Sequence, residues 1–316
     1  MTSNSIPSID LSDFTSGDPL RKAAFVNSLG QAYERIGFVA LKNHGLSQEL
    51  ENKLYAQVKA FFNAPLEIKK KYEIEGLGGQ RGYTSFGKEH AKGSLVGDLK
   101  EFWHFGQEVT DGDPIKEEYP ENVIVEELPE FNKIGMTAYK TLENTGRSVL
   151  QAIALFLGLD EHWFDAKIHN GNSILRPIHY GPITHEPKTA VRAGAHEDIN
   201  LITLLMGASA DGLQILTKQN EWVGVTALPN QIVVNVGDML QRLANNRLRS
   251  TTHRVVNPPH EKWNESRYSI PFFLHPRSDM RLDCLKSCID ENHPLSYAPI
   301  SAGEYLDERL KEIGLK

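Results

Sequence analysis

Three residues have the types and the spacing of ligands for a single metal ion. His196 and Asp198 precede the apolar, β-prone run INLITLLM, and His253 lies 55 residues after Asp198 in a second such run, TTHRVV. On a strand, residues two apart project from the same face, so His196 and Asp198 are expected to point together and Glu197 away from them. Two neutral imidazoles and one carboxylate form the facial triad that binds Fe(II) and leaves coordination positions open.

An arginine and a serine strengthen this interpretation. The chain contains 12 histidines, so an HxD triplet alone is a weak signal. Arg267 follows His253 by 14 residues, begins another strand-like run and shares a strand face with Ser269. A guanidinium binds a carboxylate through two charge-assisted hydrogen bonds, and a neighbouring hydroxyl can add a third. The set therefore suits a metal-chelating 2-oxo acid that carries a second carboxylate.

The elements that must position these residues change in character along the chain. The first half shows helical patterns at Ala23–Arg35, from an N-cap at Ser47 to about Asn63, and at Asn132–Leu157. From about Ser173, short β-prone runs alternate with turns, which is typical of an antiparallel sandwich or barrel. These runs are Ile199–Met206, Gly212–Leu216, Trp222–Thr226, Gln231–Val236, Thr252–Val256 and Tyr268–Phe273. We predict an α+β fold around an all-β core that both halves share.

Composition narrows the classes of function. The chain has 316 residues, enough for a large buried core, and its formal net charge is -7. No basic patch with interleaved aromatic residues occurs, so nucleic acid is not an expected partner. No apolar run has the length of a membrane span, and the N-terminus lacks the pattern of a secretory signal. We expect a cytoplasmic protein without a membrane partner, whose oligomeric state is open and compatible with a monomer.

Segments along nearly the whole chain carry a family resemblance. They are IPSIDLSDF, GFVALKNHGL, QRGYTSFG, DLKEFWHFG, HED, DGLQIL, NVGDMLQRLANNRLRSTTHRVV and RYSIPFF. Together they resemble the isopenicillin N synthase-like branch of the Fe(II)/2-oxoglutarate oxygenases, which includes plant flavonoid and gibberellin enzymes and bacterial relatives. The resemblance implies a double-stranded β-helix (jelly roll) core with helical N-terminal decoration. It implies an N-terminal dioxygenase region at 1–120 within the same fold, a helical segment at 121–172, the catalytic core at 173–276 and a C-terminal segment at 277–316.

The resemblance also implies a reaction and residue roles. His196, Asp198 and His253 match the family's iron ligands. Arg267 and Ser269 match the pair that holds the distal carboxylate of 2-oxoglutarate. Such an enzyme couples the oxidative decarboxylation of 2-oxoglutarate to succinate and CO₂ with hydroxylation, desaturation or cyclisation of a small organic substrate. The oxidant is O₂, and Fe(II) and the 2-oxo acid carry the difficult chemistry.

One segment departs from the family pattern. Many plant members carry Asn-Tyr-Tyr-Pro where this chain has Ile178-His179-Tyr180-Gly181. Tyr180 keeps the tyrosine that helps to hold 2-oxoglutarate in relatives. Ile178 replaces the asparagine, so one polar contact to the co-substrate is in question.

Other residues match places where relatives contact the organic substrate: Trp103, Arg176, Phe273 and His275, with Arg81 of the QRGY segment as a further candidate. Each also has a purely structural interpretation. Trp103 and Phe273 suit core aromatics. His275 suits a strand end and Arg176 a surface ion pair, and for Arg81 we favour stabilisation of a loop. This mixture of aromatic and cationic groups suits an aromatic acid, an amino acid or a terpenoid acid as substrate.

Two other functions compete with this interpretation. An oxidase of the same fold, similar to isopenicillin N synthase, uses no 2-oxoglutarate, and there the Arg-x-Ser pair binds substrate. A non-catalytic jelly-roll binding or sensor protein is the second alternative, because a fold alone does not imply activity. A polar cluster kept in a core is costly without a function, which argues against this second alternative. A hydrolytic zinc site has no need of the Arg-x-Ser pair.

Overall fold

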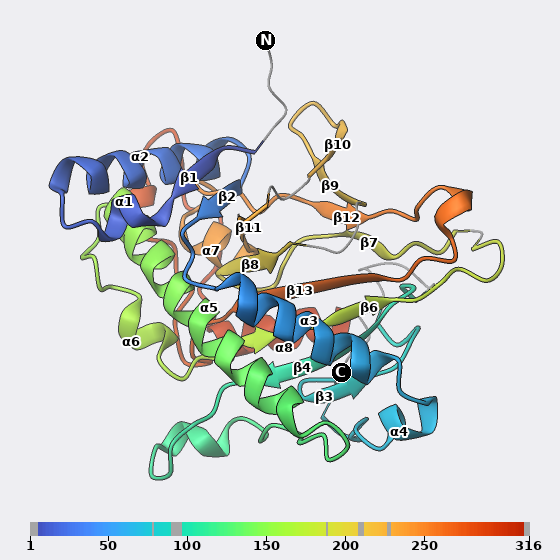
Figure 1. Ribbon diagram of the computed structural model, residues 1–316. Coiled ribbons are helices and arrows are strands. Elements are labelled where there is room, and N and C mark those ends of the chain that lie inside the picture. Colours follow the sequence, from blue (N-terminus) through green and yellow to red (C-terminus); the bar gives the residue numbers. More distant parts are fainter. Residues whose placement is uncertain are drawn as a thin grey trace.

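The protein is described by a computed structural model that covers residues 6–77, 79–89, 97–187, 189–207, 212–225 and 229–312. Within these residues, two β-sheets form the centre of the molecule (Figure 1). Neighbouring strands are antiparallel except for the first two strands of the chain, which pair in parallel. This is the mixed helix and sheet architecture that the sequence predicts.

The larger sheet draws strands from both halves of the chain. In spatial order its strands are β1 (Ser8–Asp10), β2 (Phe38–Lys42), β11 (Ile232–Val236), β8 (Ile202–Met206), β13 (Arg267–Leu274), β5 (Ile174–Leu175), β4 (Glu101–Gly106) and β3 (Gly82–Thr84). A short strand, β6 (Ile178–Tyr180), pairs with both β13 and β4. Strands β1 to β4 from the first part of the chain therefore lie in the same sheet as strands from the second half.

The smaller sheet comes from the second half of the chain alone. In spatial order its strands are β10 (Trp222–Gly224), β9 (Leu213–Leu216), β12 (His253–Val255) and β7 (Ala193–His196). Each of the six β-prone runs overlaps one observed strand, and β13 extends one residue beyond its predicted run at each end, which confirms that part of the prediction. Thr226, the predicted end of one run, lies outside the described residues.

Helices cover the outer face of the larger sheet. The α-helices are α1 (Leu11–Thr15), α2 (Pro19–Arg35), α3 (Gln48–Phe62), α4 (Leu66–Lys70), α5 (Pro129–Phe156), α6 (Asp165–Ile168), α7 (Asp238–Leu243) and α8 (Ala302–Glu312). Short 3-10 turns occur at Pro114–Glu117, His260–Lys262 and Lys286–Cys288. The long helix α5 packs on β4, β5, β8 and β13, and both α2 and α3 pack against α5. The main apolar core fills the space between these helices and the sheet.

Local sequence signals fix where the helices begin. Ser47 caps α3 as predicted, because its side chain accepts a hydrogen bond from the backbone N–H of Leu50. The predicted helix Ala23–Arg35 starts earlier, at Pro19, where the Asp18 side chain caps the helix and proline fits the first helical turn.

No described helix is both long and apolar enough to cross a lipid bilayer.

The strand that carries His196 is shorter than the sequence predicts. Strand β7 ends at His196 and β8 begins only at Ile202, so Asp198 lies in the connection between the two sheets. The expectation that His196 and Asp198 share one strand is therefore wrong. The backbone turns here because the chain leaves the smaller sheet for the larger one, and the Asp198 carbonyl accepts the N–H of Asp238 from α7.

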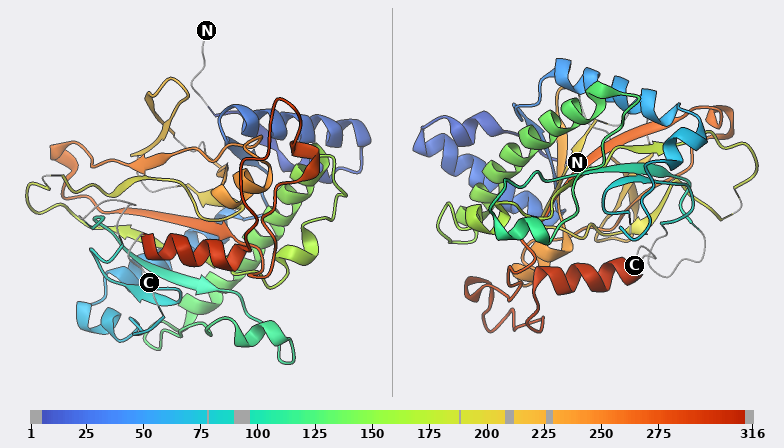
Figure 2. Two further views of the ribbon diagram at one scale, coloured as in Figure 1. Left: turned by 180° about the vertical axis from the view of Figure 1, so that it is seen from behind. Right: turned by 90° about the horizontal axis from the view of Figure 1, so that it is seen from below.

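The last described helix lies apart from the others. Figure 2 shows α8 on the side of the molecule opposite α3, with the two sheets between them. The Tyr305 hydroxyl ties α8 to α7 by donating a hydrogen bond to Asp238 Oδ2 over 2.8 Å. Leu306 and Leu310, one helical turn apart, line the cavity between the sheets.

Candidate active site

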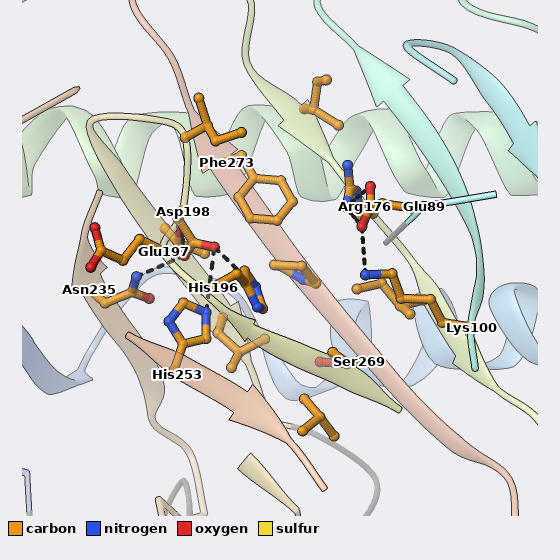
Figure 3. Close-up of a pocket in the computed structure, with 18 of the residues that line it drawn as sticks. Glu89, Lys100, Arg176, His196, Glu197, Asp198, Asn235, His253, Ser269 and Phe273 are labelled. Carbon is orange, nitrogen blue, oxygen red and sulfur yellow. Dashed lines mark hydrogen bonds and ion pairs between the residues drawn. The ribbon is translucent and has the colours of Figure 1, made fainter. Parts of the chain in front are cut away.

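The three candidate ligands converge at the open end of the smaller sheet. One ligand atom from each of His196, Asp198 and His253 lies within 4.8 Å of the others. Asp198 Oδ1 is 3.8 Å from His196 Nε2 and 3.5 Å from His253 Nε2. Figure 3 shows the carboxylate between the two imidazoles, all three at the edge of one pocket. The sheet register brings the histidines together, because His253 is paired directly with His196.

Hydrogen bonds fix the orientation of each ligand. Asp198 Oδ2 accepts from Thr203 Oγ1 at 2.6 Å and from Asn235 Nδ2 at 2.8 Å, which leaves Oδ1 facing the imidazoles. The Nδ1 atoms of His196 and His253 lie 2.7 Å and 3.1 Å from backbone carbonyl oxygens. Because a carbonyl only accepts, each Nδ1 carries a proton, and each Nε2 is turned toward Asp198 and can bind a metal when it is deprotonated. Such outer partners are what orient the ligands of a metal site.

Burial and mutual charge set the protonation states of the triad. Burial raises the pKa of Asp198, but His253 and His196 outweigh it and hold that pKa well below its usual value. Burial, aided by His253, lowers the pKa of His196 to about 4. Burial also lowers the pKa of His253, yet the adjacent Asp198 carboxylate raises it above the usual value overall. The site thus holds a carboxylate, one neutral imidazole and one imidazole that readily gains a proton.

This donor set fits Fe(II). Two imidazole nitrogens and one carboxylate oxygen lie close together among the residues that line the pocket, where they would hold a metal ion. Three protein ligands on one face leave room for a chelating acid and O₂. Asp198 is only 6 % exposed, so its charge needs a cation beside it.

A cationic end of the pocket lies further along β13. Arg267 and Ser269 both line the pocket and are nearly inaccessible to solvent, at 1 % and 4 % exposure. Tyr180 of β6 is paired with Arg267, whose guanidinium carbon lies 5.0 Å from the centre of the tyrosine ring. Ile178, which replaces the family asparagine, is paired with Ser269 and contributes an apolar wall. This end suits a carboxylate that is removed from water.

Arg192 adds positive charge near this end, which the sequence did not suggest. It is 2 % exposed, and its Nη2 donates to the Glu265 carbonyl over 2.8 Å. Burial, followed by the charge of Arg267, lowers its pKa. Arg192 directly precedes β7, the strand that carries His196.

Three of the candidate substrate residues line the opposite end of the pocket: Arg176, Phe273 and His275. The Arg176 guanidinium lies between two aromatic rings, 4.4 Å from the centre of Phe102 and 5.1 Å from that of Phe273. Burial lowers the pKa of His275 to about 4, so this imidazole is neutral near pH 7. The structure therefore brings these side chains together with the triad.

Trp103 and Arg81 lie elsewhere. Trp103 is fully buried in the main core, with its ring 4.9 Å from that of Phe61 and 5.2 Å from that of Phe131. Side chains alternate along β4, and because Phe102 contacts Arg176 beside the pocket, Trp103 points into the helical layer. Trp103 therefore does not line the pocket, and its surroundings favour the alternative of a core aromatic.

Arg81 stabilises the loop that it belongs to, the role that we favoured. Its Nη2 donates to Gln107 Oε1 over 2.7 Å, and Nη1 donates to the Gln80 carbonyl over 2.6 Å. The guanidinium packs on Gly106, where an added Cβ would lie 1.9 Å from the Arg81 Cζ. Arg81 therefore does not reach the pocket, and a side chain at Gly106 would displace it.

The sequence interpretation missed three charged residues beside Arg176. Glu89, Lys100 and Asp98 all line the pocket and are mostly buried. Figure 3 shows Glu89 between Arg176 and Lys100. Lys100 directly precedes β4 and lies two residues before Phe102, so alternation predicts that the two share a face but not that this face meets the cavity.

Comparisons with known proteins agree with this geometry. Residues 6–127 match the family model described as the non-haem dioxygenase in morphine synthesis N-terminal, and residues 171–276 match the 2OG-Fe(II) oxygenase superfamily. The 2-oxoglutarate-Fe(II) type oxidoreductase hxnY of Emericella nidulans is 30% identical over 97% of this chain and 89% of its own length.

Two solved structures are similar in fold and sequence. A 2OG-Fe(II) oxygenase family protein from Caulobacter crescentus has a TM-score of 0.87 and 41% identity, and the match covers 97% of this chain and 98% of that one. A full-length Neurospora crassa protein in complex with alpha-KG and thymine has a TM-score of 0.85 and 29% identity over 98% of both chains. These matches confirm the jelly-roll expectation and favour neither the oxidase nor the non-catalytic alternative. The chain belongs to the 2OG-Fe(II) oxygenase superfamily and is an enzyme that uses Fe(II), 2-oxoglutarate and O₂.

Proposed function

We propose that His196, Asp198 and His253 hold the Fe(II) and that Arg267 and Ser269 hold the distal carboxylate of 2-oxoglutarate. A small organic substrate occupies the remainder of the pocket. The observation that carries this proposal is that one pocket is lined by the triad, by Arg267 and Ser269, and by Arg176, Phe273 and His275. The reaction couples formation of succinate and CO₂ from 2-oxoglutarate to oxidation of the substrate.

The residues of the triad act by keeping their charge and orientation. The bound iron and 2-oxo acid supply the activation of O₂. Thr203 and Asn235 hold one oxygen of Asp198, so the other stays directed at the metal position. The lowered pKa values of Asp198 and His196 keep both in the ligand form near neutral pH.

Arg267 and Ser269 act by replacing the water that a carboxylate loses on burial. Removing a carboxylate from water is costly unless a fixed cation and hydrogen-bond donors meet it. Arg267 offers a forked guanidinium and Ser269 a hydroxyl on the same strand face, and Tyr180 is paired beside them. Arg192 strengthens the positive field through its buried charge.

The lining of the pocket supports a small-molecule substrate. Aromatic and aliphatic walls, among them Phe38, Ile174 and Leu205, surround a few polar groups, as is usual for small-ligand sites. The similar Neurospora crassa protein holds thymine together with alpha-KG, and thymine is a molecule of this scale. The negative net charge offers nothing that favours nucleic acid.

A screen of small molecules for stimulated succinate release tests the proposal. The protein is purified without oxygen, loaded with Fe(II) and 2-oxoglutarate, and exposed to O₂ with each compound. We expect a compound that raises succinate release and is itself oxidised in equal amount. Oxidation of a compound that proceeds equally well without 2-oxoglutarate would contradict the proposed role of Arg267 and Ser269.

A further inference from the structure

Four charged side chains form a linked row at the substrate end of the pocket. Arg176 Nη1 donates to the two Glu89 carboxylate oxygens over 3.1 and 3.3 Å. Lys100 Nζ lies 2.5 Å from Glu89 Oε1 and 2.8 Å from Asp98 Oδ2. The other Asp98 oxygen accepts the backbone N–H of Gly194, two residues before His196, over 3.0 Å. The row therefore joins the wall at Arg176 to the strand that carries a metal ligand.

These groups are charged although they are buried. Burial alone would raise the pKa of Glu89, but the charges of Arg176 and Lys100 outweigh it and hold that pKa well below the usual value. Burial alone would lower the pKa of Lys100, but Glu89 and Asp98 raise it above the usual value. His104, which accepts from Arg176 Nε, is kept neutral because burial and Arg176 hold its pKa well below the usual value.

The four side chains of the row consequently have a net charge of zero. It contains two cations, Arg176 and Lys100, and two carboxylates, Glu89 and Asp98. The positive charge of Arg176, taken alone, suits an acidic substrate, but Glu89 already neutralises it. Among the described residues, Arg176 Nη2 has no hydrogen-bond partner, so it still offers N–H donors to a ligand.

We propose that the substrate is an uncharged molecule with a carbonyl-type acceptor for Arg176, and that Glu89 is the residue that selects it over acids. This inference rests on the proposed function, because it assigns the substrate to the same pocket. A neutral carbonyl accepts from Nη2 while every ion pair of the row stays intact. Its flat or apolar body packs against Phe273, whose ring also contacts the guanidinium.

An acid meets a penalty in the same place. Its carboxylate would have to draw Arg176 away from Glu89, and one buried carboxylate would then lose half of its neutralising charge. Leaving a buried charge uncompensated is strongly unfavourable. The opposite end of the pocket differs, since Arg267, with Arg192 near it, favours the dianionic co-substrate. The two ends of one cavity therefore separate an acidic co-substrate from a neutral substrate.

Matched pairs of ligands that differ in charge test the proposal. The probes are nicotinamide and nicotinate, cinnamamide and cinnamate, and thymine and uracil-5-carboxylate. Their dissociation constants are measured by anaerobic calorimetry on the protein loaded with Fe(II) and 2-oxoglutarate. The variants are Glu89→Gln, which keeps the shape and removes the charge, and Asp98→Asn, which still accepts from Gly194. The control is Glu73→Gln, because Glu73 forms an ion pair with Lys88 over 2.8 Å and does not line the pocket.

We expect at least one neutral probe to bind the wild type, about 10-fold or more tighter than its acid. In Glu89→Gln the ratio should move toward the acid by about 10-fold or more, with a smaller movement in Asp98→Asn and none in Glu73→Gln. Asp98→Asn carries the test if Glu89→Gln does not fold. Wild-type preference for the acids, failure of every neutral probe, or an unchanged ratio in the folded variants would overturn the inference. Iron and 2-oxoglutarate binding are measured on the same samples, and their loss in the wild type would instead overturn the proposed function.

Discussion

His253 lies directly opposite His196 in the antiparallel pair of β12 and β7, and the centres of their imidazole rings are 4.4 Å apart. Two strands that are adjacent in one sheet thus present both proposed nitrogen ligands side by side. Asp198 arrives from the connection to the other sheet, and Thr203 and Asn235 hold it in place. The proposed metal site is therefore built from residues of both sheets and the connection between them.

Removal of one histidine should abolish iron binding while the fold survives. His196 is partly exposed at a strand end, so His196→Ala leaves little buried volume unfilled. A facial triad has only three protein ligands, and we expect the variant to lose stoichiometric Fe(II) and all turnover. Iron content after anaerobic gel filtration measures this, with His260→Ala, on an exposed turn, as the control. Wild-type iron content in His196→Ala would show that this histidine is not a ligand.

The apparent affinity for metal should fall at low pH because a single group, His253, gains a proton. Above its raised pKa, His253 is neutral and free to bind metal; below it, a proton occupies the site and the apparent affinity falls. His196 and Asp198, with lowered pKa values, do not add protons in the same range. We expect the apparent affinity for Mn(II) to fall about tenfold per pH unit below the pKa of His253. A fall of about a hundredfold per unit, or none, would contradict these assignments.

Changes at the cationic end should act on the co-substrate in a graded manner. Truncating one partner of a buried charge pair costs roughly 2–5 kcal/mol, so Arg267→Ala should raise the KM for 2-oxoglutarate about 30-fold or more. Arg267→Lys keeps the positive charge but loses the two parallel N–H donors of the guanidinium. Its KM for 2-oxoglutarate should lie between those of the wild type and Arg267→Ala. Ser269→Ala should cost about 1 kcal/mol, one hydrogen bond. Arg254→Ala is the control and should leave the KM unchanged, because this partly buried arginine lies over Trp222, donates to Gln214 and does not line the pocket.

Truncation of Trp103 should affect mainly stability, whereas truncation of Phe273 should affect mainly the response to the organic substrate. Trp103 is fully buried among aromatic rings, so Trp103→Ala should lower the free energy of unfolding by about 3–5 kcal/mol. The half-saturating concentration of 2-oxoglutarate should not change. Phe273→Ala should destabilise less and should weaken stimulation by the organic substrate. Urea unfolding measures the loss of stability, and substrate-stimulated succinate release measures the response to the organic substrate. If Trp103→Ala were as stable as the wild type but responded less to the substrate, Trp103 would be a substrate contact and not a core residue.

The sequence was most informative where chemistry depends on strand alternation. His253, Arg267 and Ser269 lie on strands whose register brings them to one cavity, and spacing alone predicted that face. It could not decide between the two roles of Trp103, because alternation does not say which face of β4 meets the cavity. It also missed Glu89 and Asp98, whose role depends on how the segment before β4 packs against β7. Cytoplasmic location and a monomeric state stay predictions.

An anaerobic titration of the Fe(II)-loaded protein with 2-oxoglutarate tests the central claim most directly. Chelation of the ferrous centre by the 2-oxo acid gives a visible charge-transfer band, so one experiment reports both metal and co-substrate. We predict the band in the wild type, no band in Asp198→Ala, and in Arg267→Ala a band of the same final intensity that needs about 30-fold or more 2-oxoglutarate. A band in Asp198→Ala, or wild-type half-saturation in Arg267→Ala, would contradict the account.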